Sequence, residues 1–219
     1  MNLARSLERR LERLIEGFAS KLFPGAVSAP ELAQRLIREA DLSVTEGPAG
    51  PVVPNVYGVR IHPDDLGSAQ APNELTGELA ALIDEHVLSN GWRLEGDVHV
   101  QVVADSSMSP GAVHIAANVV KGALPRWAYL VLRATGDEIS LDSNRTLIGR
   151  DVDADVRLDA EEVSRRHALI WREGPDVWIA DLGSSNGSLV NGGRAAGPML
   201  IANGDSIIFG SVETTFRMV

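Results

Sequence analysis

The residues after Trp127 carry no helical pattern, and this constrains the fold more than any other feature of the 219-residue chain. Short apolar runs recur there at close intervals, separated by turn residues such as Gly174-Pro175-Asp176 and Asn203-Gly204-Asp205. Runs of this length, bounded by such turns, are typical of an all-β sandwich. The pattern predicts strands at residues 129–132, 138–141, 146–148, 156–158, 168–171, 177–180, 206–209 and 214–218.

The first 120 residues mix helical and strand patterns. Apolar residues three and four apart predict a helix at 3–22, which could pack on its own domain, dock a partner or lie on a membrane surface. Ser28 and Pro30 open a second helix, because serine caps helices and proline suits the first turn. Further predicted elements are a Gly- and Pro-rich loop at 45–54, a helix at 74–89, and strands at 56–61, 98–102 and 113–120. This order predicts an α+β domain with helices on a small, mostly antiparallel sheet.

Charge and composition exclude several classes of function. The formal net charge is −10, with −7 in residues 1–120 and −3 in residues 121–219. Neither half offers the basic surface of a nucleic-acid-binding protein, so we expect no nucleic-acid partner. Cysteine is absent, and the five histidines show no paired ligand spacing. We therefore expect no disulfide, no metal and no cofactor.

The sequence also gives no sign of secretion or membrane insertion. The N-terminus leads into a charged segment, and no apolar run reaches about 18 residues. We expect a cytoplasmic protein without direct membrane insertion.

Polar clusters between residues 147 and 192, most of which contain glycine, hold the candidate binding residues. They are Gly149-Arg150, Ser164 to His167, and Asp181 to Ser188, and a Val190-Asn191-Gly192 run follows. In a sandwich such clusters fall on end loops, where binding residues concentrate. They offer a fixed cation, several hydroxyls and an amide, which can hold a phosphate and a peptide backbone.

Each side chain has a defined chemical use in such a site. The guanidinium of Arg150 can pair bidentately with a phosphate and never loses its charge. Ser164 can donate a hydroxyl hydrogen bond to the same phosphate, and the amide of Asn186 can both donate to and accept from a peptide backbone. Gly149 and Gly187 suit tight turns or close backbone approach.

These clusters resemble the forkhead-associated (FHA) domain, a module that binds phosphothreonine peptides, over roughly Arg126 to Val219. The resemblance implies that Arg165 and Ser185 also contact phosphate or peptide. It makes His167 a structural brace for the Ser164 loop rather than a general base or ligand. Residues that would support the site structurally are Gly149, His167, Gly187, Asn191 and Gly192. Ser188 stands where the family often has threonine.

The first half resembles a second family. Its opening Leu-Glu-Arg-Arg-Leu-Glu-Arg-Leu run, the Pro30-Glu31-Leu32-Ala33 segment and Val53-Pro54-Asn55 are similar to the N-terminal domain of actinobacterial FHA-domain protein A. We therefore expect an α+β domain at 1–120, a short linker at 121–126 and an FHA sandwich at 127–219. The family often has a long linker, whereas this chain has only a few residues at that point.

An enzyme is the weaker interpretation. Residues 183–187 match the G-x-S-x-G elbow of hydrolases, but that elbow needs a following helix and a later histidine, and His167 is the last histidine here. We expect a non-catalytic adaptor that binds phosphothreonine-containing proteins, with a Ser/Thr protein kinase and its substrates as partners. The resemblance implies control of cell-wall synthesis or division, and recruitment by phosphorylated membrane partners. The alternative is a constitutive scaffold that acts through the N-terminal domain.

Overall fold

The computed structural model describes residues 23–68 and 71–219, so the helix predicted at 3–22 lies outside the described residues. The chain divides into two compact units. The first takes its residues from Met1–Glu46, Pro51–Ser89 and Leu94–Ala123. The second consists of Gly47–Gly50, Asn90–Arg93 and Leu124–Val219. Two short segments from the first half of the sequence therefore belong to the second unit.

The first unit is built on a three-stranded sheet with the order β4-β3-β5. The strands are β3 (Val56–Ile61), β4 (His99–Ala104) and β5 (Val113–Asn118). β3 pairs with β4 in parallel and with β5 antiparallel, so the prediction of a mostly antiparallel sheet is wrong. The physical reason is the helix between β3 and β4, because a crossover helix returns the chain parallel to the first strand.

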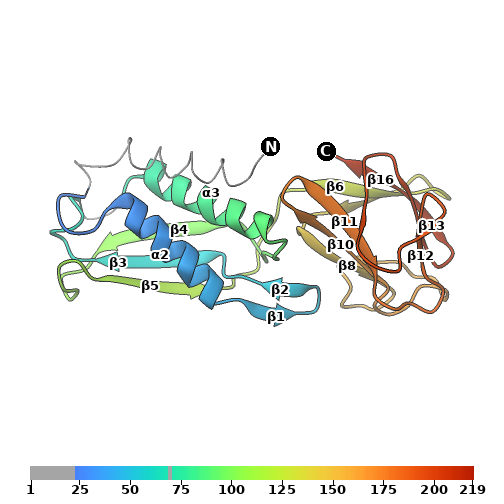
Figure 1. The fold of residues 1–219 in the computed structure, drawn as a ribbon, viewed down its shortest axis with the longest axis horizontal. Coiled ribbons are helices and arrows are strands. Elements are labelled where there is room, and N and C mark those ends of the chain that lie inside the picture. Colours follow the sequence, from blue (N-terminus) through green and yellow to red (C-terminus); the bar gives the residue numbers. More distant parts are fainter. Residues whose placement is uncertain (1–22, 69–70) are drawn as a thin grey trace. The chain divides into compact units, whose positions relative to one another are not determined.

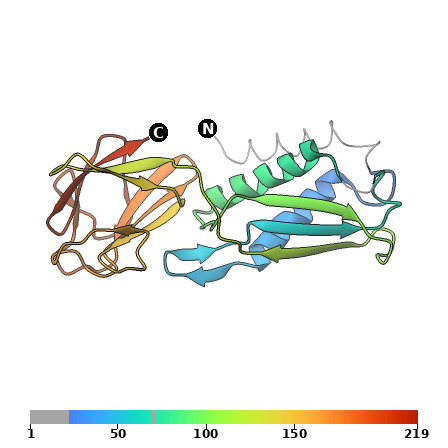
Figure 2. The same cartoon turned by 180° about the vertical axis from the view of Figure 1, so that it is seen from behind.

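Helices α2 (Ala29–Leu42) and α3 (Asn73–Ser89) lie on one face of this sheet, and the strands come to the front when the view is turned (Figures 1 and 2). The Ser28 hydroxyl accepts the Glu31 N–H at 3.4 Å, so the predicted cap is confirmed. The residues buried between helices and sheet are mostly aliphatic: Leu32, Leu36, Val59, Leu75, Leu79, Leu82 and Ile83. The residues of this set that belong to α2 and α3 recur three and four positions apart, as the buried face of an amphipathic helix requires.

The segment predicted as a loop at 45–54 contains two short strands. β1 (Thr45–Gly47) and β2 (Gly50–Val52) form a two-stranded sheet of their own. Gly50 has φ 107°, a conformation that favours glycine and permits the tight reversal after Pro48. The loop prediction was wrong here because strands of three residues leave no alternating pattern to detect.

The second unit is a sandwich of two β-sheets, which confirms the predicted fold class. One sheet has the strand order β14-β11-β10-β8-β9, and the other has the order β13-β12-β15-β16-β6-β7. The strands of the first sheet are β8 (Arg145–Gly149), β9 (Val156–Arg157), β10 (Ala168–Glu173), β11 (Asp176–Asp181) and β14 (Met199–Leu200). Those of the second are β6 (Ala128–Leu132), β7 (Glu138–Leu141), β12 (Ser188–Val190), β13 (Gly193–Arg194), β15 (Ser206–Phe209) and β16 (Val212–Met218).

Apolar side chains from both sheets fill the space between them. Alternate residues of each strand point inward, as the period of a β-strand requires. The fully buried members include Leu130, Ile148, Ile170, Ile179, Ile207, Phe209 and Phe216. This core fixes the strand ends from which the candidate binding loops emerge.

Candidate functional site

Three loops of the sandwich meet and bring the predicted binding residues together. They are residues 150–155 between β8 and β9, 158–167 between β9 and β10, and 182–187 between β11 and β12. The Arg150 N–H donates to the Ser164 carbonyl at 3.0 Å, and the Ser185 N–H donates to the Ser164 hydroxyl at 3.1 Å. The Asn186 amide donates to the Glu162 carbonyl at 2.8 Å. Four residues that lie up to 36 positions apart in the sequence therefore share one surface.

Arg150 supplies the cation of this surface. Its side chain is exposed, and its Nε donates to the Val163 carbonyl at 3.2 Å. This hydrogen bond holds the guanidinium by one edge. The two terminal nitrogens, which form the fork that pairs with a phosphate, have no hydrogen-bond partner among the described residues.

Ser164 is half-buried beside Arg150, and Arg165 is exposed. The Ser164 oxygen already accepts the Ser185 N–H, so its own hydrogen can be donated to a phosphate oxygen. Ser185 and Asn186 are exposed on the neighbouring loop. The surface thus brings polar side chains from two adjoining loops together.

His167 is fully buried beneath the loops. Its Nδ1 accepts the Ser164 N–H at 3.0 Å, and its Nε2 lies 3.1 Å from the Gly187 carbonyl. Because an accepting ring nitrogen carries no proton, Nε2 carries it and donates to Gly187. The ring edge also packs on Phe209, with centroids 5.9 Å apart. His167 therefore joins the Ser164 loop to the start of β12.

Asp181 organises the third loop and was missed in the sequence. Its carboxylate accepts the Ser184 N–H at 2.7 Å, the Ser184 hydroxyl at 2.6 Å and the Ser188 hydroxyl at 2.7 Å. Burial acts to raise the pKa of Asp181, but the hydrogen bonds from Ser184 and Ser188 hold it below its ordinary value. An aspartate three residues before a serine is a recognisable turn signal, which could have identified it.

The structure separates the Asn191-Gly192 pair from the loops. Asn191 (φ 48°) and Gly192 (φ 83°) form the two-residue turn between β12 and β13, at the opposite end of β12 from Gly187. Positive φ at both positions is what a tight hairpin needs, and Asn-Gly supplies it. The Asn191 side chain donates to Asp205 at 2.9 Å. The side chain of Asn191 therefore supports the hairpin turn after β12.

Within 23–68 and 71–219, no group of three His, Cys, Asp or Glu residues could hold a metal ion. Over the same residues, no helix is both long and apolar enough to cross a membrane.

Two family models match this chain. The model for the N-terminal domain of FhaA matches residues 4–116, more than half of the chain, and the FHA domain model matches residues 146–210. The oxoglutarate dehydrogenase inhibitor of Corynebacterium jeikeium is 35% identical over 113 residues, which is 50% of this chain and 78% of that protein. The glycogen accumulation regulator GarA of Mycobacterium tuberculosis is 31% identical over 155 residues, which is 69% of this chain and 86% of that protein.

Solved structures resemble a smaller part of the chain. The structure of Mycobacterium tuberculosis EmbR in complex with a low-affinity phosphopeptide is 39% identical, with a TM-score of 0.41. That match covers 42% of this chain and 24% of EmbR. The family models, of which the FhaA N-terminal domain model matches more than half of the chain, show that the chain belongs to the family of FHA-domain proteins that carry an FhaA-type N-terminal domain.

Proposed function

We propose that this protein is a non-catalytic signalling adaptor that binds phosphothreonine-containing protein segments through its FHA unit. One observation carries the proposal: Arg150 and Ser164 lie side by side, joined by the hydrogen bond from the Arg150 N–H to the Ser164 carbonyl. A phosphothreonine carries nearly two negative charges and strong acceptor oxygens. A fixed guanidinium fork beside a hydroxyl donor complements both properties.

The neighbouring loop supports the peptide part of the proposal. Asn186 is exposed, and its amide nitrogen is already held by the Glu162 carbonyl. Its carbonyl oxygen is therefore oriented by that bond and can accept an N–H from a bound backbone. Arg165 and Ser185 flank the same surface and are proposed as further phosphate or peptide contacts.

The contacts of the histidine and serines favour binding over catalysis. Both ring nitrogens of His167 are used by backbone groups, which leaves neither for taking a proton from a nucleophile. The Ser184 hydroxyl donates to Asp181 within the loop. An activated serine needs a base in hydrogen-bond reach, and the buried position of His167 does not provide one.

The cellular role that we propose is drawn from the resemblance to relatives. One relative is named as an inhibitor of oxoglutarate dehydrogenase and another as a regulator of glycogen accumulation, so relatives act on other proteins or pathways. From the resemblance of the N-terminal domain to that of FhaA, we infer a role downstream of Ser/Thr protein kinases in the control of cell-wall synthesis or division. In this role, phosphorylated membrane partners recruit the protein.

A pair of peptide pools tests the proposal. One pool has a fixed phosphothreonine and randomised flanking residues, and the other has the same design with unmodified threonine. Fluorescence anisotropy with the full chain should show saturable binding of the first pool only. Equal binding of both pools, or of neither, would exclude phosphothreonine recognition as the function.

A further inference from the structure

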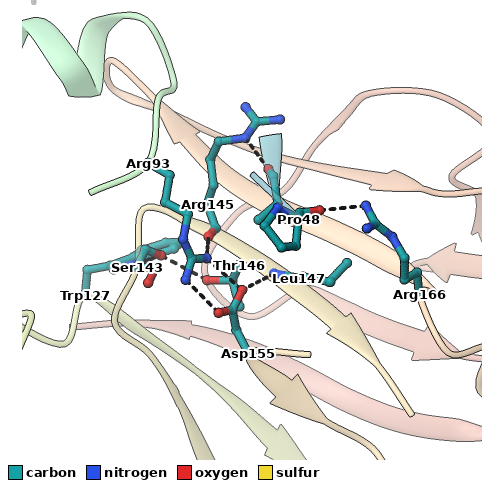
Figure 3. Close-up of polar contacts among 10 residues, drawn as sticks. Pro48, Arg93, Trp127, Ser143, Arg145, Thr146, Leu147, Asp155 and Arg166 are labelled. Atoms are coloured by element: carbon teal, nitrogen blue, oxygen red, sulfur yellow. Dashed lines mark hydrogen bonds and ion pairs between the residues drawn. The ribbon is translucent and has the colours of Figure 1, made fainter. Parts of the chain in front are cut away.

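Arg93 makes three hydrogen bonds within the second unit, two of them to Asp155. Its Nη1 donates to the Arg145 carbonyl at 2.6 Å and to Asp155 at 2.7 Å, and its Nη2 donates to the other Asp155 oxygen at 2.8 Å (Figure 3). The Arg93 side chain is only 10% exposed, and that of Asp155 is 27% exposed. A two-pronged pair with this burial holds both partners in one orientation.

Asp155 connects Arg93 to the loop that carries Arg150. Besides binding Arg93, its carboxylate accepts the backbone N–H of Leu147 in β8 at 2.7 Å. Asp155 is the last residue of the 150–155 loop, and β9 starts at the next residue. The carboxylate therefore ties the end of this loop back to the strand from which it leaves, and Arg93 fixes the carboxylate.

Arg145 and Arg166 make further hydrogen bonds between the sandwich and the two segments from the first half of the sequence. Arg145 donates to the carbonyls of Ala49 at 2.8 Å and Gly91 at 2.9 Å, and its guanidinium lies 5.1 Å from the centre of the Trp171 ring. Arg166 donates to the Pro48 carbonyl at 2.6 Å (Figure 3). The segments Gly47–Gly50 and Asn90–Arg93 thus bind β8 and the Ser164–His167 stretch, the two places from which Arg150 and Ser164 project.

A restrained loop has a direct consequence for affinity. A ligand that binds only one loop conformation has its apparent affinity reduced by the fraction of molecules in that conformation. Loops that are already ordered also lose less entropy on binding. The ion pair raises the fraction of molecules in which Arg150 stands beside Ser164 before any ligand arrives.

We propose that Arg93 is a positioning residue for phosphothreonine binding, which acts through Asp155 on the loop that presents Arg150. The proposal rests on the proposed phosphopeptide function. It places a determinant of ligand affinity outside residues 146–210, the part of the chain that matches the FHA model. The FHA site of this protein is therefore completed by a segment from the first half of the sequence.

The test uses the full chain and the fluorescent phosphothreonine pool. Arg93→Ala should weaken binding about tenfold if the competent loop conformation falls to about a tenth of the population. Arg60→Ala is the matched control, because Arg60 forms an exposed ion pair with Asp105 in the first unit, and it should bind as wild type. Arg93→Lys keeps the positive charge but lacks the planar guanidinium that donates to both Asp155 oxygens. This variant should recover part of the lost binding affinity.

Two measurements separate positioning from general stability. Asp155→Asn keeps the size of the side chain, and it should weaken binding without unfolding the unit. The double variant Arg93→Ala/Asp155→Ala should bind no more weakly than Asp155→Ala alone, because Arg93 acts on the loop through Asp155. In Arg93→Ala, amide exchange should accelerate at residues 150–154 and stay unchanged in β10 and β11.

The outcomes distinguish the two proposals. If wild type binds the phosphorylated pool, Arg150→Ala does not, and folded Arg93→Ala and Asp155→Asn bind as wild type, the positioning role is wrong and the function stands. If wild type does not distinguish the phosphorylated from the unphosphorylated pool, the function is wrong and the positioning role falls with it. Weaker binding by Arg93→Ala and Asp155→Asn, with partial recovery in Arg93→Lys, supports the positioning role.

Discussion

Gly149 lies directly against the backbone carbonyl of Arg165. A Cβ atom at position 149 would stand 2.0 Å from that oxygen, 2.8 Å from the Arg165 carbonyl carbon and 3.2 Å from the Ser164 oxygen. All three atoms belong to the backbone, so no flexible side chain can move away. The approach lets the Arg150 and Asp151 N–H groups reach the carbonyls of Ser164 and Arg165. Glycine is needed here for space rather than for a left-handed conformation.

Gly149→Ala should therefore push the two loops apart. We expect the free energy of unfolding of the second unit to fall by about 1–3 kcal/mol, as for overpacked positions. Binding of the phosphothreonine pool should weaken as well, because Arg150 and Ser164 would separate. Gly197→Ala is the control, since nothing lies within 4 Å of a Cβ at that position. Urea denaturation and anisotropy measure both effects, and two variants with equal stability and affinity would contradict the prediction.

Arg150→Ala removes the proposed phosphate ligand. A hydrogen bond to a charged group contributes about 1.5–3 kcal/mol, so affinity for the phosphothreonine pool should fall at least about tenfold. Arg217→Ala removes an equally exposed arginine from β16 and should have no effect. Calorimetric titration of the two variants gives the comparison. Unchanged affinity in Arg150→Ala would assign the phosphate to another residue.

Phosphoserine should bind more weakly than phosphothreonine. The resemblance to FHA domains implies an apolar hollow for the γ-methyl group, and burying one such group contributes about 0.8 kcal/mol, or roughly fourfold in affinity. The stiffer rotamer of threonine acts in the same direction. Two peptide pools that differ only in the phosphorylated residue provide the measurement. Equal dissociation constants would mean that this chain has no such hollow.

Asp181 should make the stability of the second unit sensitive to acid. Its pKa is below the ordinary value, so its carboxylate stabilises the fold above the unfolded-state pKa of about 3.9. This contribution is lost as the pH falls through the lower pKa of the folded state. Asp181→Asn should cost about 1–3 kcal/mol at pH 7, and the difference from wild type should shrink below about pH 4.

Urea denaturation between pH 3 and pH 7, followed by the amide signals of β10, measures this difference. Asp159→Asn is the control, because that carboxylate is exposed and pairs with Arg157 at 3.5 Å. A difference between Asp181→Asn and wild type that does not change with pH would show that Asp181 acts through its shape and not its charge.

The sequence predicted elements with a clear period and missed those without one. β3 and β15 begin and end where alternation predicts, because their apolar residues face a packed core. β12, β13 and β14 are two or three residues long, too short for any period to appear. The parallel pairing of β3 with β4 was also missed, since residue pattern alone does not give strand direction.

The candidate site shows the same contrast between residues with a local sequence signal and residues without one. Arg150, Ser164 and Asn186 were predicted as site residues because each lies in a short motif with its own chemistry. Asp181 carried a local signal, three residues before Ser184, that was overlooked. The pair of Arg93 and Asp155 had no local signal, because the partners are 62 residues apart and each is an ordinary surface residue by composition. Only the fold shows that they meet.

The discontinuous second unit has a consequence for folding kinetics. Its contacts reach across 62 residues from Arg93 to Asp155 and across 118 residues from Pro48 to Arg166. Contacts of such separation raise the contact order, and closing long loops slows folding. During synthesis from the N-terminus, Pro48 and Arg93 are made well before their partners exist. Arg93 can therefore join this unit only after Asp155 has been synthesised, and Pro48 only after Arg166.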